Sequence, residues 1–181
     1  MILELNYTCS LKRNNLTSSF QTKVASLRTQ SLLMKIIESR IDIDAPKDLV
    51  WAVLLDFDNY HLWNPFTPKI ECDLVVGNPV HLHVDMKQNK KIRIQTETLL
   101  WVKERESIAW GITQTFPVKT ERAQIVKEIG PNKSSYYTYD KFWGLLVPIV
   151  MLGFKKDIQI GFDAVALGLK QRAEELYAKQ A

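Results

Sequence analysis

The chain has 181 residues, and its 24 Lys and Arg residues against 20 Asp and Glu residues give a formal net charge of +4 at pH 7. This length fits a single domain with one core, because cores normally split only beyond roughly 250 residues. Residues 1–33 hold four basic side chains and one acidic side chain, so the rest of the chain carries a net charge of only +1. That balance argues against nucleic-acid binding, which depends on clustered Lys and Arg.

Residues 1–33 differ from the rest of the chain in composition. They contain nine Ser or Thr residues and no clear apolar core of a secretory signal. The composition fits a disordered extension, residues upstream of the true start, an organelle-targeting peptide or a short added helix. We therefore expect a cytoplasmic protein, or an organellar one if these residues are a transit peptide.

The two cysteines and the apolar runs exclude further classes. Cys9 and Cys72 lie in different segments and predict neither a disulfide framework nor a cysteine metal site. No apolar run reaches the ~18 residues that a membrane-spanning helix needs. We accordingly expect no transmembrane segment, and the sequence leaves the oligomeric state open.

The patterned region opens with a strand and two short helices. Apolar and charged residues alternate between Ile37 and Ile43, which predicts a half-buried strand that ends before Pro46. Pro46 suits the first turn of a helix, and the apolar residues between Val50 and Phe57 predict one. A second short helix is predicted within residues 58–65.

Six strands and a long helix are predicted to follow. The strand-like segments are roughly Lys69–Val76, Pro79–Met86, Lys91–Lys103, Ser107–Thr115, Thr120–Ile129 and Ser134–Trp143. Short turns between them imply antiparallel pairing, and the resulting sheet has one face that needs cover. Within Pro148–Ala178 the large apolar residues recur mostly three or four apart, which predicts the covering helix.

The predicted C-terminal helix contains three glycines. Gly153, Gly161 and Gly168 each cost roughly 1 kcal/mol relative to Ala in an exposed helix interior. Close packing of another segment would offset that cost, and so would a ligand occupying the space beside the helix.

Three passages resemble the START-like superfamily, also called SRPBCC, which includes the birch-pollen allergen, lipid-transfer START domains and bacterial polyketide cyclase/dehydrase-like proteins. They are Ile41–Pro46 with Val50-Trp51, Asp56–Tyr60 through Trp63–Phe66, and Asp140–Pro148 with the later Gly161-Phe162 and Leu169-Lys170. The resemblance spans residues 34 to about 178. Many cyclase-like relatives carry a histidine and an aromatic residue near the penultimate strand, where this chain has Ala123-Gln124-Ile125, a departure that puts a catalytic role there in doubt.

The resemblance implies an α+β helix-grip fold. In it a curved antiparallel sheet of about seven strands wraps around the long C-terminal helix, and an apolar cavity lies between them. We therefore divide the chain into an extension, residues 1–33, and a START-like ligand-binding domain, residues 34–181.

The implied function is the binding of a small hydrophobic molecule, such as a lipid, an aromatic compound or a polyketide-like compound. The resemblance places Trp63 and Phe66 near the mouth of the cavity. Alternation along the strands and the helix predicts that its wall includes Val80, Leu82, Val84, Ile94, Thr96, Thr98, Trp110, Ile112, Phe154, Ile158, Gly161, Phe162 and Val165. The opposing interpretation is that these faces form a filled core. A third hypothesis is a protein-interaction domain, which would combine a filled core with a large exposed apolar patch.

An enzyme of the polyketide cyclase/dehydratase type is the alternative function, so the sequence leaves enzymatic activity open. Asp140, Tyr137 and Tyr139 are the candidates for proton transfer in the same cavity. His81 and His83 share one face of a strand, but their apolar neighbours are better core candidates, so we predict no metal site. No nucleophile elbow or glycine-rich phosphate loop occurs, and we predict no cofactor.

Overall fold

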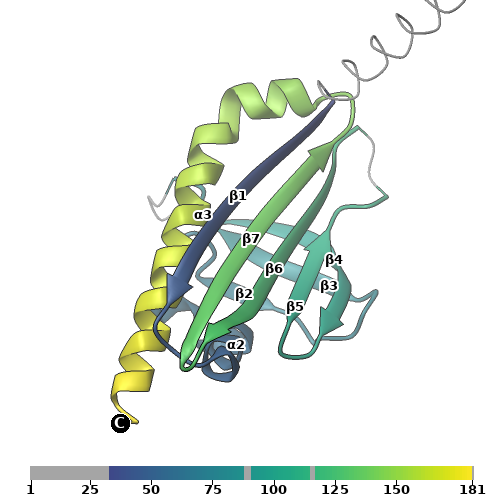
Figure 1. Cartoon of the computed structure of the whole chain (residues 1–181). Helices are drawn as coiled ribbons and strands as arrows, with labels where there is room; N and C mark the ends of the chain where they lie inside the picture. Colours follow the sequence, from purple (N-terminus) through teal and green to yellow (C-terminus); the bar gives the residue numbers. More distant parts are fainter. Residues whose placement is uncertain (1–32, 88–90, 115–116, 181) are drawn as a thin grey trace, which may run out of the picture.

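The computed structural model describes residues 33–87, 91–114 and 117–180 (Figure 1). Its elements, in chain order, are β1 (Met34–Ile43), α2 (Lys47–Leu55), η1 (Phe57–Leu62, a 3-10 helix), β2 (Lys69–Glu71), β3 (Pro79–Val84), β4 (Arg93–Lys103), β5 (Ser107–Gly111), β6 (Lys119–Gly130), β7 (Lys133–Trp143) and α3 (Val147–Ala178). Except for Leu33, the predicted extension lies outside the described residues.

The strands form one seven-stranded sheet over the described residues, in the order β1-β7-β6-β5-β4-β3-β2. Every neighbouring pair is antiparallel. Figure 1 shows α3 running along the sheet beside β1, with α2 near the far end of the strands. This is the predicted α+β helix-grip arrangement, and it is confirmed.

One predicted strand is much shorter than expected. The segment 69–76 pairs only over Lys69–Glu71, because the chain turns immediately afterwards. Leu74 has a φ of 59°, a left-handed conformation that ends a strand. The Asp73 carboxylate stabilises the turn by accepting hydrogen bonds from the Val75 backbone N–H and from Asn78.

The core lies between the sheet and α3. On α3 the buried side chains Ile158, Phe162, Val165 and Leu169 recur three or four residues apart, so they form one face of the helix. Each fully buried side chain of this size stabilises the fold by about 1.5–3 kcal/mol. None of the described helices has the length and apolar character needed to cross a membrane.

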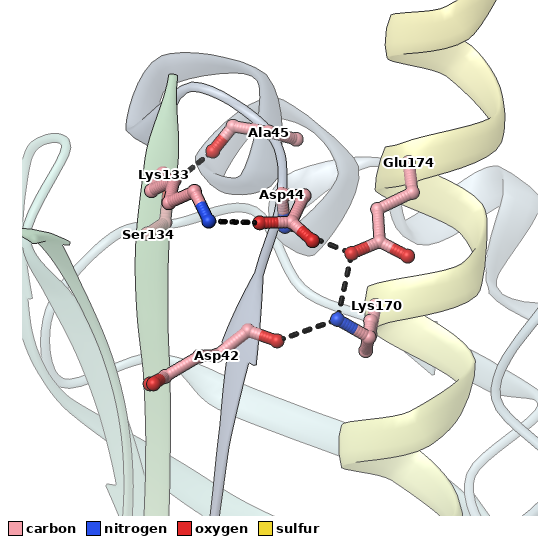
Figure 2. Close-up of polar contacts among 7 residues, drawn as sticks. All are labelled: Asp42, Asp44, Ala45, Lys133, Ser134, Lys170 and Glu174. Carbon is pink, nitrogen blue, oxygen red and sulfur yellow. Dashed lines mark hydrogen bonds and ion pairs between the residues drawn. The ribbon is translucent and has the colours of Figure 1, made fainter. Parts of the chain in front are cut away.

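A polar latch fixes the second half of α3 to the end of β1 and the start of β7 (Figure 2). Its residues are Asp42, Asp44, Ala45, Lys133, Ser134, Lys170 and Glu174. The Lys170 ammonium donates hydrogen bonds to the Asp42 carbonyl and to the Glu174 carboxylate, each at 2.7 Å. The same carboxylate accepts the Asp44 backbone N–H at 2.8 Å. Because this latch joins three elements, it sets the position of α3 along the sheet.

Two of the three glycines of α3 are explained by close packing. A Cβ atom on Gly161 would overlap the Phe66 ring, and one on Gly168 would overlap the Trp63 carbonyl oxygen. At Gly153 a Cβ atom would meet no heavy atom within 4 Å. The close approach of residues 63–66 therefore accounts for Gly161 and Gly168, whereas nothing in the structure accounts for Gly153.

Candidate functional site

A cavity of about 560 Å³ lies between the first half of α3, residues 147–162, and the sheet. Its apolar wall consists of Phe66, Leu82, Val84, Met86, Val118, Phe142, Val150, Phe154, Ile158 and Phe162. The other lining residues are Lys87, Lys91, Arg93, Gln95, Glu97, Thr120, Arg122 and Asp140. A mostly apolar cavity of this volume with a few polar groups is typical of sites for small molecules.

The cavity opens to solvent where its lining residues are exposed. Lys87 and Arg93 are exposed on the β3–β4 hairpin, and Phe154 of α3 is 41% exposed. A ligand would therefore enter between this hairpin and the first half of α3, past a cationic rim.

Six of the predicted cavity residues lie in the wall: Phe66, Leu82, Val84, Phe154, Ile158 and Phe162. Trp63, Val80, Trp110 and Val165 are instead buried in the core, and Ile112 lies just beyond the end of β5. Gly161 packs under the Phe66 ring rather than beside open space. The cavity therefore lies under the first half of α3, and these other predicted residues pack elsewhere in the interior.

The structure corrects the predicted orientation of β4. Ile94, Thr96 and Thr98 were expected to face the cavity, but Ile94 is 66% exposed. In an antiparallel pair, residues directly opposite each other point to the same face. Leu82 points inward from β3, so its partner on β4, Gln95, also points inward. Every side chain of this part of β4 therefore lies on the opposite face from the predicted one.

This register brings three charged residues together at the wall of the cavity, the buried Glu97 and Arg122 and the half-buried Asp140. We refer to these three residues as the polar cluster. The three residues come from β4, β6 and β7, and Arg122 lies directly opposite Asp140 in the sheet. Only 6% of Glu97 and 6% of Arg122 is exposed. Neither Glu97 nor Arg122 was among the site residues predicted from the sequence. The register with β3 is the signal that would have revealed Glu97.

The polar cluster has unused hydrogen-bonding capacity. Glu97 Oε2, Arg122 Nε and Asp140 Oδ1 are all buried and have no hydrogen-bond partner among the described residues. The other Glu97 oxygen accepts a hydrogen bond from Gln95, and the Arg122 guanidinium lies 4.3 Å from the centre of the Phe162 ring. A buried polar group without a partner costs about 1–3 kcal/mol, so a ligand that supplies partners would recover part of this cost.

Burial also changes the protonation of the cluster. Desolvation raises the pKa of Glu97 to about 7, although the nearby charge of Arg122 and the Gln95 hydrogen bond oppose the rise. Desolvation, and then the charge of Glu97, raise the pKa of Asp140 well above its usual range, with Arg122 again opposing. Near neutral pH this pair of carboxyl groups therefore holds at least one proton that it can donate.

The two tyrosines proposed as proton donors point away from the cavity. The Tyr137 hydroxyl donates to the Glu38 carboxylate at 2.6 Å, and the Tyr139 hydroxyl donates to the Glu121 carboxylate at 2.9 Å. Burial and these carboxylates raise the pKa of each tyrosine to about 12. Alternation along β7 explains the difference, because it directs Asp140 inward and both tyrosines outward. Of the three candidates, the cavity includes Asp140 alone.

The histidines of β3 each lie next to a polar side chain of a neighbouring strand or segment. His83 Nε2 lies 3.3 Å from a Glu71 carboxylate oxygen, and His81 Nδ1 lies 3.0 Å from the Thr96 hydroxyl. Within the described ranges there is no group of three or more His, Cys, Asp or Glu residues that could hold a metal ion. His81 and His83 alternate with the buried residues Val80 and Leu82, so they point away from the core, as predicted.

Comparison with known proteins places this geometry in context. A family model described as polyketide cyclase / dehydrase and lipid transport matches residues 34–174. The search of curated proteins gave no match.

Several solved structures share the fold. The ZhuI aromatase/cyclase from a Streptomyces strain matches with a TM-score of 0.63 and 23% sequence identity, covering 78% of this chain and 94% of that one. A START superfamily protein from Mycobacterium smegmatis has a TM-score of 0.60 and 20% identity, with 78% and 98% covered. Norcoclaurine synthase from Thalictrum flavum has a TM-score of 0.60 and 15% identity, with 79% and 96% covered.

Proposed function

We propose that this chain, which belongs to the polyketide cyclase/dehydrase and lipid transport family, binds a small, mainly apolar molecule between the sheet and α3. The observation that carries the proposal is the cavity of about 560 Å³, whose wall is mostly apolar and whose buried polar atoms lack partners. A lipid, an aromatic compound or a polyketide-like compound would fit these properties.

Two contributions to the binding free energy indicate which kind of ligand the cavity favours. Burial of apolar surface contributes roughly 25 cal/mol per Å², less the cost of ordering the ligand. The polar cluster favours a ligand whose polar end both donates and accepts hydrogen bonds, because the cluster offers a guanidinium N–H and two carboxyl oxygens. A purely hydrocarbon ligand would leave these atoms unpaired and bind more weakly.

Native mass spectrometry of the protein purified from its source, followed by solvent extraction, tests the proposal. We expect a bound molecule that survives gentle ionisation and is recovered in the extract. The variant Ile158→Trp would fill the cavity, because Ile158 is buried in its wall. The control Ile160→Trp changes the same residue type at a position on the same helix that is 49% exposed.

We expect Ile158→Trp to lose the bound molecule and Ile160→Trp to retain it. Circular dichroism of both variants verifies that the comparison is made between folded proteins. A ligand retained equally by both folded variants would place the binding site outside this cavity and would contradict the proposal.

A second candidate function, catalysis of the cyclase or dehydratase type, is favoured by one specific observation. The cavity contains two carboxyl groups with raised pKa values, and that of Glu97 is about 7. A carboxylic acid that is still protonated near neutral pH is suited to proton transfer to a bound substrate. In such a reaction the cluster would supply the proton that a substrate oxygen receives, and its carboxylate form would accept the proton that leaves the substrate, with Arg122 stabilising negative charge on the substrate oxygen.

Turnover of a polyketide-like substrate separates this function from simple binding. We expect Asp140→Asn and Glu97→Gln to remove activity while the substrate still binds, and activity to fall as the pH rises above about 7 because the acid loses its proton. Tyr137→Phe and Tyr139→Phe are controls, since both hydroxyls face away from the cavity. Activity that survives both carboxyl substitutions would exclude this mechanism.

A further inference from the structure

The first half of α3 carries large apolar side chains on two opposite faces. One face, which includes Val150 and Phe154, lines the cavity. The other face has no cover among the described residues: Leu152 is 91% exposed, Ile149 is 67% exposed and Ile160 is 49% exposed. We refer to Ile149 and Leu152, which lie in the first turns of the helix, as the outer stripe. Large apolar side chains that are strongly exposed and lie close together on one helix face are typical of an interaction site.

The charges next to the outer stripe are of one sign. Between Val147 and Lys156 the charged side chains of α3 are Lys155 and Lys156, and both are exposed. The first acidic residue of the helix is Asp157, which is half-buried. The nearby cavity entrance adds the exposed Lys87, Lys91 and Arg93. An apolar stripe flanked by cations on one helix is typical of segments that lie on membranes containing anionic lipids.

The second half of α3 lacks this combination. It carries the acidic residues Asp163, Glu174 and Glu175, and the polar latch fixes it against β1. Figure 1 shows that α3 bends, so that its first turns lie across the end of the sheet where β1 begins and the remainder runs down beside the strands. A flat surface can therefore contact the first turns without contacting the second half.

A second copy of the chain fits the outer stripe less well. A symmetric dimer applies the same patch of both copies to each other, which would bring Lys155 and Lys156 of one copy close to those of the other. Like charges placed together at an interface oppose association. Anionic lipid head groups instead supply the opposite charge.

We propose that the outer stripe and Lys155 and Lys156 form a docking surface for membranes that contain anionic lipids. The hydrophobic side chains enter the interfacial layer of the bilayer and the lysines pair with head-group phosphates. Docking places the cavity entrance, between α3 and the β3–β4 hairpin, beside the membrane surface. The inference goes beyond ligand binding in the cavity and does not depend on it.

Fluorescence of a label on the outer stripe tests the proposal. An environment-sensitive fluorophore is attached to Leu152→Cys in a full-length Cys9→Ser, Cys72→Ser background. The matched control carries the label at Leu167→Cys, which lies in the second half of α3 and is 48% exposed. Labelled protein is titrated with phosphatidylcholine vesicles and with vesicles that also contain phosphatidylglycerol.

We expect the label at position 152 to increase in emission and shift to the blue with the anionic vesicles only, and the label at 167 to stay unchanged. Raising the ionic strength to about 1 M should weaken the response, because the Debye length falls to about 3 Å. No response, or an equal response at both positions, would overturn the proposal. A blue-shifted emission of the label at position 152 without vesicles would overturn the proposal, because something other than a membrane would then cover the outer stripe. The cover would be a second copy of the chain if the shift grows with protein concentration, and another part of the same chain if it does not.

Sedimentation of unlabelled variants with the anionic vesicles gives a second measurement. Leu152→Glu should lower partitioning at least about tenfold, equivalent to about 1.4 kcal/mol, whereas Leu167→Glu should leave it unchanged. Partitioning that survives Leu152→Glu would overturn the proposal. The cavity-filling variant Ile158→Trp should still bind vesicles, so this test fails or succeeds independently of the proposed ligand site.

Discussion

Glu97→Gln should stabilise the protein at neutral and alkaline pH while leaving its stability at acid pH nearly unchanged. The pKa of Glu97 is raised from 4.5 to about 7 because the carboxyl is buried in the wall of the cavity. Between these two values the folded protein holds a proton that the unfolded chain has released, so the free energy of unfolding falls as the pH rises. A pKa difference of this size corresponds to about 3 kcal/mol once the pH exceeds about 7. Glutamine is neutral at every pH and removes this loss.

Urea unfolding of the wild type and the variant between about pH 4.5 and about pH 8 measures the effect. The two free energies should nearly coincide at the acid end and separate by about 3 kcal/mol at the alkaline end. Because the charge of Glu97 also raises the pKa of Asp140, the variant relieves that carboxyl in the same direction. Glu104→Gln, in a turn where the side chain is 87% exposed, is the control and should give no such separation. Parallel profiles for wild type and Glu97→Gln would refute the burial and the charge state derived for the cluster.

Three further predictions concern packing, the latch and the outer face of the sheet. Gly161→Ala should lower the free energy of unfolding by about 1–3 kcal/mol, because the added methyl group meets the Phe66 ring. Gly153→Ala should raise the free energy of unfolding by about 0.5–1 kcal/mol, because its methyl group enters open space and Ala favours the helix. Equal urea midpoints for the two variants would contradict the packing assigned to Gly161. Lys170→Ala should destabilise the protein by about 1 kcal/mol through loss of two hydrogen bonds in the latch, as thermal unfolding would show. Tyr139→Phe should leave ligand affinity unchanged in a titration, because its hydroxyl faces away from the cavity, and weakened binding would count against that orientation.

The fold could be predicted because its main signals are local. Alternation along the strands, the turns between them and the three-or-four spacing of apolar residues in the last helix each arise within a few neighbouring residues. The polar latch could not be predicted in this way. Lys170 donates to the carbonyl of Asp42, which is 128 positions away in the sequence, and nothing near either residue indicates the contact.

The cavity was harder to predict because one strand gives an ambiguous alternation. In β4 the residues Ile94, Thr96 and Thr98 look like the inward face, since the intervening Arg93, Gln95 and Glu97 are polar. Pairing with β3 decides the orientation, and it turns Gln95 and Glu97 toward the cavity and places Arg93 at its entrance. A site that buries charged groups will contradict a hydrophobic pattern at the functional residues themselves. Glu97 could not be proposed from the sequence for this reason, whereas the resemblance at the end of the last strand pointed to Asp140.

The two halves of α3 differ in what lies beneath them, and this difference locates the site. Under the second half, the latch and the close approach of Trp63 to Gly168 hold the helix directly against its neighbours. Under the first half, the helix covers a cavity, so its inner side chains lack partners over part of their surface and contribute less dispersion energy. Local stability is lowest where buried contacts are fewest, so the first half is the part that can move aside most easily. Ligand entry and contact with an anionic membrane would then involve the same few turns of helix, because Phe154 borders the entrance on one side and Leu152 is exposed on the other.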